Sequence, residues 1–255
     1  MEPEQIRPER LAAAEAAPPG AIPKLAVADA ACSAGLDPDA PLNEDLALAL
    51  LEHRDLPVET LERLGRDPAL MKSRKVRFAL AAHPRTPRHL GLRLLRHFYT
   101  ADLMLFGLRP AVAADLKHYA AEQLVTRLPS VTLGERIMLA RRASETVAGA
   151  LLLDMEARVA RTALDNARLT ETAVMKALAR RTAGPAFVEA VCHHAKWSVR
   201  PEIRLALLRS PHTPLARALE FARRLPPPLL RDILHTSHLP ERIKSYLREN
   251  LKQKP

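Results

Sequence analysis

The chain has few of the residues that build strands, disulfide frameworks and metal sites. Only 4% of its 255 residues are aromatic, glycine occurs 8 times, and Cys32 and Cys192 are the two cysteines. Runs of Val, Ile, Thr or aromatic residues with two-residue alternation are missing, so the sequence has no strand signal. The cysteines lie far apart and match no metal-ligand spacing. We therefore expect free thiols in a reducing cytoplasm and no metal site.

Membrane and catalytic signals are also missing. No apolar run approaches the roughly 20 residues that span a bilayer. The opening "MEPEQIRPER" lacks the basic and apolar regions of a secretory signal. A glycine-rich phosphate loop and a Ser–His–Asp pattern are absent, and no carboxylate pair has a spacing that requires acid–base chemistry. These absences predict no membrane association, no cofactor and no catalytic residue, hence a protein that is not an enzyme.

What the chain does contain is alanine, leucine and unevenly placed charge. Hydrophobic residues make up 47% and charged residues 27%, as in a globular protein rich in helix formers. Residues 1–71 hold 6 Lys/Arg and 14 Asp/Glu, a net of −8, whereas residues 72–255 hold 33 and 15, a net of +18. The basic residues either keep the helices soluble or attract an acidic partner, which would be a protein or a nucleic acid.

The first 40 residues differ in composition from the rest. They are rich in Ala and Pro, as in "AAAEAAPPGAIPK". This composition predicts a mobile acidic leader over residues 1–40, with residues 41–255 as the folded domain.

A helical segment recurs five times after the leader. The copies are "LPVETLERLGR" from Leu56, "TPRHLGLRLLR" from Thr86, "TLGERIMLARR" from Thr132, "TETAVMKALAR" from Thr170 and "TPLARALEFAR" from Thr213. Each leading Thr is predicted to cap a helix of eleven or twelve residues through its hydroxyl, and each Pro that follows is predicted at the first helical position. Thr132 and Glu135 have the spacing of a capping box.

The spacing of the copies predicts the architecture. The starts at 86, 132, 170 and 213 are 46, 38 and 43 residues apart, with two further helical segments between them. A period near 40 indicates stacked helices, in which each unit buries its apolar face only against its neighbours. We predict an all-α solenoid of about four to five HEAT-like units; a compact bundle without repeats is the alternative.

The quoted repeats support a resemblance to a known family. The string "VRFALAAHPRTPRHLGLRLL", echoed by "IRLALLRSPHTPLARALEFA", resembles the bacterial leucine-rich-repeat-variant and HEAT-like α-solenoids over roughly residues 44 to 250. The resemblance implies the fold and a binding role. Some relatives carry an iron–sulfur cluster on a separate cysteine-rich segment, which this chain lacks, and a few HEAT-like proteins are DNA glycosylases, whose catalytic residues match nothing here.

The tenth residue after each start is an arginine, and four copies place a second basic residue beside it. We call the set the arginine ladder, and its predicted binding residues are Arg66, Arg96, Arg141, Arg142, Arg180, Arg181, Arg223 and Arg224. A cation in the last turn also complements the helix dipole, so a structural role is the alternative. In register, these guanidinium groups would follow a row of carboxylates or phosphates.

Three functional hypotheses follow from these observations. The first is a non-catalytic scaffold that docks an acidic protein partner on its basic surface. The second is sequence-independent binding of DNA or RNA along the ladder, and the third is a HEAT-like DNA-repair glycosylase.

Other conspicuous side chains are predicted to be structural. Trp197 and Phe98 are expected in the core, and "VCHH" has no partner ligands for a metal. His53, His83, Asn166 and Ser210 occupy the same place in their repeats, which predicts a role at helix ends. Oligomeric state is left open.

Overall fold

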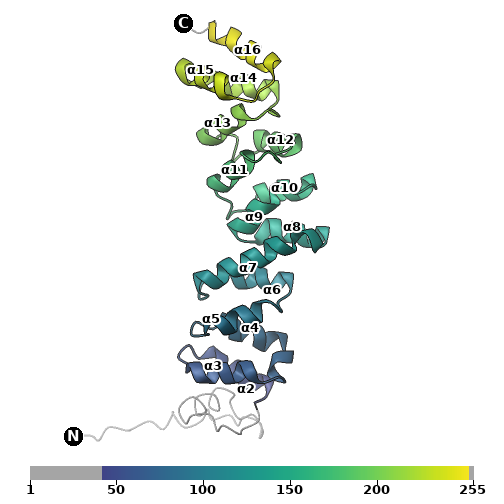
Figure 1. Ribbon diagram of the computed structural model, residues 1–255, viewed down its shortest axis with the longest axis vertical. Coiled ribbons are helices and arrows are strands. Elements are labelled where there is room, and N and C mark those ends of the chain that lie inside the picture. Colours follow the sequence, from purple (N-terminus) through teal and green to yellow (C-terminus); the bar gives the residue numbers. More distant parts are fainter. Residues whose placement is uncertain (1–41, 253–255) are drawn as a thin grey trace, which may run out of the picture. The chain divides into compact units, whose positions relative to one another are not determined.

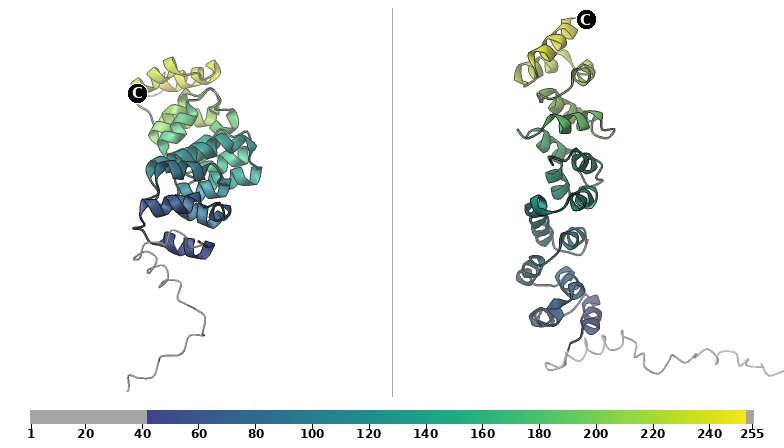
Figure 2. Two further views of the ribbon diagram at one scale, coloured as in Figure 1. Left: turned by 60° about the horizontal axis from the view of Figure 1, so that its bottom comes forward. Right: turned by 90° about the vertical axis from the view of Figure 1, so that its right-hand side faces the viewer.

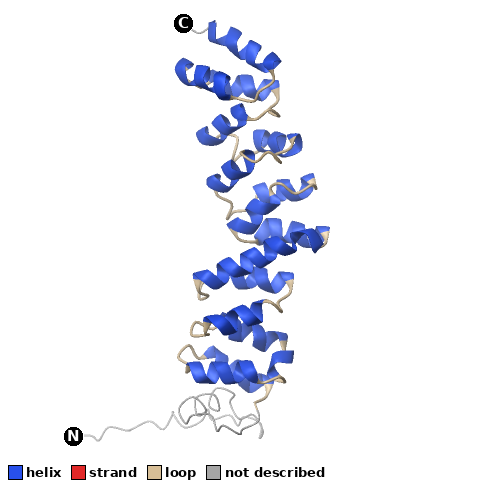
Figure 3. Ribbon diagram, in the orientation of Figure 1, coloured by secondary structure: helices blue, strands red, loops and turns tan. Residues whose placement is uncertain are grey.

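The structure is a computed structural model that describes residues 42–252, and short helices joined by loops make up this part of the chain (Figures 1 and 3). Within these residues there are fifteen α-helices, two 3₁₀ turns and no strand. The all-α prediction is therefore confirmed for them. The predicted mobile leader of residues 1–40 lies outside the described residues.

The α-helices take their bounds from caps and prolines close to those the sequence indicates. They are α2 (Glu44–Glu52), α3 (Val58–Arg66), α4 (Arg74–Ala82), α5 (Arg88–Leu95), α6 (Thr100–Gly107), α7 (Ala114–Arg127), α8 (Leu133–Arg142), α9 (Glu145–Leu151), α10 (Ala157–Leu164), α11 (Glu171–Leu178), α12 (Pro185–His193), α13 (Pro201–Arg209), α14 (Leu215–Arg223), α15 (Pro227–Thr236) and α16 (Glu241–Lys252). The 3₁₀ turns are η1 (Leu70–Lys72) and η2 (Leu128–Ser130).

The chain divides into two compact units, residues 1–90 and residues 91–255. In the described part of the first unit, α2 packs on α4, and α3 packs on η1 and α4. Its core is formed mainly by leucines that are fully buried, among them Leu50, Leu61, Leu64 and Leu80.

In the second unit, most helices pack on the next helix but one, and α6–α7, α8–α9, α9–α10 and α13–α14 also pack as neighbours in sequence. We call α6, α8, α10 and α12 the first stack, and α7, α9, α11, α13 and α15 the second stack, because consecutive members of each set are in contact. The two columns are visible in the second unit of Figure 1 and in the right-hand view of Figure 2. This sequential packing is the arrangement of a helical-repeat, solenoid-like protein.

Turn residues connect each module to the end of an earlier helix. In the first unit, His83 is buried and its Nε2–H donates to the carbonyl of His53 at 2.9 Å, while its Nδ1 accepts the backbone N–H of Arg85 at 3.2 Å. The guanidinium of Arg85 donates to the carbonyl of Asp55 at 3.0 Å. Carbonyls left open at a helix end are thus satisfied by the next module.

An asparagine performs the same task in the second unit. The Nδ2 of Asn166 donates to the carbonyl of Ala140 at 2.8 Å and to that of Ala143 at 3.2 Å, and its Oδ1 accepts the N–H of Arg168 at 2.8 Å. The Arg168 guanidinium donates to the carbonyl of Arg142 at 3.2 Å. The predicted helix-end role is confirmed for His83 and Asn166, and we call these cross-module bonds carbonyl bridges.

Two further carbonyl bridges use larger side chains. Arg127 donates to the carbonyl of Phe98 at 2.6 Å and to that of Arg96 at 3.2 Å. Trp197 is 1% exposed, and its indole N–H donates to the carbonyl of Leu164 at 2.8 Å. The predicted core positions of Phe98 and Trp197 are confirmed, because both side chains are buried.

The threonine caps form where no proline follows. The hydroxyl of Thr132 accepts the N–H of Glu135 at 3.3 Å, and the Glu135 carboxylate accepts the N–H of Thr132 at 2.9 Å, which completes the predicted capping box. Thr170 caps α11 by accepting the N–H of Ala173 at 3.2 Å. These two caps are confirmed.

The prediction is wrong for the two Thr-Pro copies. Thr86 and Thr213 instead donate their hydroxyls backward, to the carbonyls of Leu80 and Leu207. Pro214 occupies the cap position of α14 and so precedes the first helical residue. A proline fixes its own φ and favours extended backbone in the residue before it, so the helix begins later and the threonine closes the preceding helix.

Candidate functional site

All eight residues of the arginine ladder are exposed, although their surroundings differ. Arg66 donates to the Glu62 carboxylate at 2.9 Å within α3. The helices are shorter than the predicted eleven or twelve residues, with 9 in α3, 8 in α5, 10 in α8, 8 in α11 and 9 in α14. Arg96 and Arg180 therefore lie just beyond the last turn, because α5 ends at Leu95 and α11 at Leu178.

The ladder does not follow a single stack. α8, which ends in Arg141 and Arg142, packs on α6, α9 and α10, whereas α11, which precedes Arg180 and Arg181, packs on α9 and α13. The sequence contains a signal for this alternation. From α5 onward, two helices lie between equivalent helices, so α11 is the third helix after α8 and falls on the opposite stack. The binding role assigned to the ladder stays a prediction.

Capping of helix carbonyls is performed by other arginines. Arg85, Arg127 and Arg168 donate to carbonyls at the ends of earlier helices. Within residues 42–252, no hydrogen bond or ion pair involves the side chains of five ladder members, which are Arg96, Arg141, Arg142, Arg180 and Arg181. These five cations are therefore available to a ligand, beyond any favourable interaction with the helix dipole.

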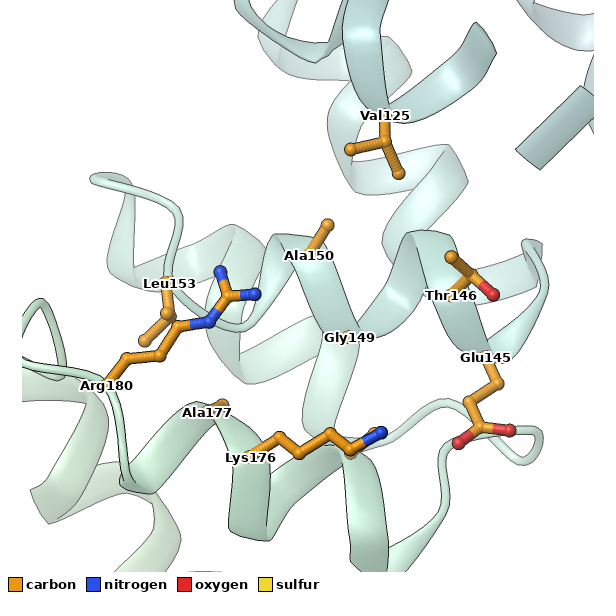
Figure 4. Close-up of a pocket in the computed structure, with 10 residues that line it drawn as sticks. Val125, Glu145, Thr146, Gly149, Ala150, Leu153, Lys176, Ala177 and Arg180 are labelled. Atoms are coloured by element: carbon orange, nitrogen blue, oxygen red, sulfur yellow. The ribbon is translucent and has the colours of Figure 1, made fainter. Parts of the chain in front are cut away.

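A groove crosses three consecutive helices of the second stack, and we call it the α9–α11 groove (Figure 4). It encloses about 350 Å³. It is lined by Val125, Glu145, Thr146, Gly149, Ala150, Leu153, Ala173, Lys176, Ala177 and Arg180. The floor consists of small and apolar residues, so a bound chain can approach the helix backbones closely.

Two cations and one carboxylate border this floor. In Figure 4, Arg180 extends from the end of α11 toward α9, and Lys176 extends toward the end of α9 that carries Glu145. The Glu145 carboxylate accepts the hydroxyl of Thr170, while the Lys176 and Arg180 side chains have no carboxylate partner within residues 42–252. The groove thus combines an apolar floor with two open positive charges.

A second hollow lies beside the groove, between the ends of α11 and α13, and we call it the arginine pocket. It encloses about 510 Å³. Its lining is Leu178, Ala179, Arg180, Arg181, Ala183, Ala206, Arg209, Ser210, Pro211, His212 and His238. No carboxylate lines it, and Arg180 belongs to both hollows. Three arginines therefore line one hollow that no carboxylate lines, and the Arg180 side chain extends toward α9 and the groove (Figure 4).

A third hollow, between α10 and α12, carries charges of both signs. Its lining includes Asp165, Glu189, His193 and His194, and His194 Nε2 lies 3.1 Å from the Asp165 carboxylate. His193 instead bonds the carbonyl of Glu189 at 2.9 Å, so the adjacent histidines point to different partners. Among the described residues, no three His, Cys, Asp or Glu side chains are grouped to hold a metal ion.

Cys192 sits in the core of α12, next to these histidines. Its side chain is buried, and burial raises the pKa of the thiol from 9.0 to about 12. Because the thiolate is the reactive form, we predict that a Cys32→Ser variant resists thiol reagents at about pH 8 and becomes fully labelled in denaturant. Absorbance of the released chromophore measures this, and complete labelling of the native variant within minutes would contradict it.

The sequence did not reveal the two hollows. The small residues of the groove floor come from α9 and α11, at positions that also suit close helix packing. The arginine pocket joins residues from three separate turns. The sequence pattern identifies only part of the arginine pocket. Arg180 and Arg181 belong to the ladder, whereas Arg209 lies outside it.

Within residues 42–252, every helix is too short or too polar to cross a bilayer. Comparisons of the chain with protein-family models, with curated proteins and with solved structures find no match. The fold is therefore assigned from the structure itself: the described residues form an all-helical repeat protein.

Proposed function

We propose that the chain is a non-catalytic, cytoplasmic scaffold of the HEAT-like, leucine-rich-repeat-variant kind. Its α9–α11 groove docks an acidic segment of a partner protein. The observation that carries the proposal is the pairing of an apolar floor with two cations that have no carboxylate partner among the described residues.

The floor supports binding of a peptide segment. The groove runs across α7, α9 and α11, so a segment lying in it contacts three successive helices. Gly149 and Ala150 expose little side chain, which permits close approach of a second backbone. Stacked helical repeats provide extended surfaces of this kind for binding partners.

The charge supports an acidic occupant. Lys176 and Arg180 are exposed on the α11 side of the floor, and residues 72–255 carry a net of +18. Carboxylates of a partner would pair with both side chains. Exposed pairs contribute only about 0.3–1 kcal/mol each, so the charges select the partner and speed its association, and the buried apolar contacts add affinity.

Nucleic acid is the main alternative occupant of the basic surface. A phosphodiester backbone would need cations in a continuous row, whereas Arg142 and Arg180 belong to different stacks. Single strands also bind through exposed aromatic platforms. Among the described residues, the exposed aromatic side chains are Tyr99 and Tyr246, and neither lines the groove. These observations favour the protein partner.

The test compares acidic and basic peptides on the full-length chain. A fluorescein-labelled peptide of Glu-Ala-Ala-Leu repeats should bind, its Lys counterpart should not, and fluorescence anisotropy measures both. The double variant Lys176→Glu with Arg180→Glu should weaken binding at least about tenfold, equivalent to about 1.4 kcal/mol. The matched control, Arg158→Glu with Arg231→Glu, makes the same charge change on exposed positions outside the groove.

Equal loss in both double variants would reduce the effect to net charge and refute the groove as the site. A second readout uses pull-down from nuclease-treated lysate with mass spectrometry. Acidic proteins held by the wild-type chain and the control variant, and lost from the Lys176/Arg180 variant, support the proposal. Captured material that disappears entirely on nuclease treatment would show that nucleic acid is the ligand.

A further inference from the structure

The arginine pocket has three arginines in its lining, which come from the ends of α11 and α13. Arg181 follows α11, and Arg209 is the last residue of α13. With Arg180 they border a hollow of about 510 Å³ that no carboxylate lines. We infer that this pocket binds a phosphate monoester, carried by a phosphorylated serine or threonine of the acidic segment that docks in the α9–α11 groove; the inference rests on that proposed function.

The state of the three guanidinium groups favours a ligand over a structural role. Arg181 and Arg180 make no side-chain hydrogen bond or ion pair within residues 42–252, and the same is true of Arg209. Two carbonyls at the end of α13 already have donors outside that helix. The carbonyl of Arg209 accepts the N–H of His238 at 3.2 Å, and that of Leu207 accepts the hydroxyl of Thr213. Arg209 is thus not required as a donor to these two carbonyls of α13.

The chemistry of the lining fits a monoester better than a single carboxylate. A phosphate monoester has about −1.5 to −2 charges at neutral pH and three acceptor oxygens, and planar guanidinium groups bind such oxygens in pairs. Arg181 and Arg209, with Arg180 shared between the pocket and the groove, supply this density of positive charge. His212 and His238 also line the pocket, and the Ser210 hydroxyl accepts the N–H of His212 at 3.4 Å.

The position of the pocket connects it to the groove. Arg180 lines both hollows, so a segment leaving the groove past α11 reaches the pocket without crossing another helix. A phosphorylated residue at that end of the segment would meet Arg181 and Arg209, while carboxylates further back meet Lys176. The pocket therefore gives the scaffold a response to phosphorylation of its partner.

The experiment separates the pocket from the groove. The full-length chain is titrated with the Glu-Ala-Ala-Leu peptide carrying one terminal Ser, in unmodified and phosphorylated forms. Phosphorylation should tighten binding at least about tenfold, as new charge-assisted hydrogen bonds form. The Arg181→Gln with Arg209→Gln variant should lose this gain and keep the affinity for the unmodified peptide, whereas the Lys176/Arg180 variant loses both. Both arginines are exposed, so folding is unaffected, and circular dichroism checks it.

A second arm tests the pocket without the groove. N-acetyl-phosphoserine amide, inorganic phosphate and diethyl phosphate are titrated by NMR. The first two should shift the backbone amides of Ser210 and His212 in the wild type alone, and the monoanionic diester should shift them much less. A monoester response unchanged by the Arg181/Arg209 substitutions would overturn the inference even if the groove binds. Single-stranded RNA that displaces the phosphopeptide, and depends on the same two arginines, would overturn it in favour of nucleic acid.

Discussion

Replacement of Trp197 by alanine is expected to lower the free energy of unfolding by about 4 kcal/mol, a typical loss for a large aromatic core side chain. The indole is 1% exposed, so its removal leaves a cavity between the end of α12 and α10. The carbonyl of Leu164 also loses its donor, and the ammonium of Lys196, which lies 4.1 Å from the ring centroid, loses a cation–π contact.

Urea denaturation followed by circular dichroism measures the effect of the Trp197 substitution, because Trp197 is the chain's one tryptophan and its fluorescence vanishes in the variant. The matched variant is Trp197→Phe, which keeps one buried aromatic ring and removes the N–H together with the rest of the indole. It should cost about 1–2 kcal/mol, the penalty for an unsatisfied carbonyl. Equal costs for both variants would mean that the hydrogen bond, and not the buried ring, dominates.

The second large effect is expected for Asn166→Leu, which should destabilise the chain by about 3 kcal/mol as buried polar groups lose their partners. Asn166 is 2% exposed and bonds three backbone groups, the carbonyls of Ala140 and Ala143 and the N–H of Arg168. Leucine has the same branching and the same number of side-chain heavy atoms, so it fills the site without any hydrogen-bonding group and tests the carbonyl bridge.

Asn166→His provides the control, because His83 makes the equivalent bonds in the first unit. Its ring offers one donor and one acceptor and should recover at least half of the stability that leucine loses. Both variants are measured by thermal and urea denaturation. If histidine destabilises as much as leucine does, the two turns are not equivalent and the comparison of repeats fails at this position.

The features that were predictable from the sequence depend on local chemistry. Alanine- and leucine-rich segments with threonine or proline at their starts indicate helices, and the structure has helices there. The wrong threonine caps arise from competition between two helix ends. Thr86 and Thr213 each have an open helix end on both sides, and the proline that follows decides which carbonyl or N–H they reach.

The register of the ladder and the two hollows depend on three-dimensional packing. A repeat in the sequence shows that a helix recurs. Whether the next copy joins the same stack depends on whether it follows after an even or an odd number of helices. The arginine pocket brings Arg181, Arg209 and His238 together from turns that share no motif. Such a set is recognisable only once α11 and α13 are known to be neighbours.

The carbonyl bridges run in one direction along the chain. In every one, the donor follows the acceptor by 23 to 33 residues. During synthesis, the ends of α2, α5, α8 and α10 therefore lack these hydrogen bonds until that length has emerged, roughly 1 to 7 seconds at about 5–20 residues per second. A module added after the last one would bring donors for carbonyls that precede it. A module added before the first would bring carbonyls whose donors must come from residues already in the chain.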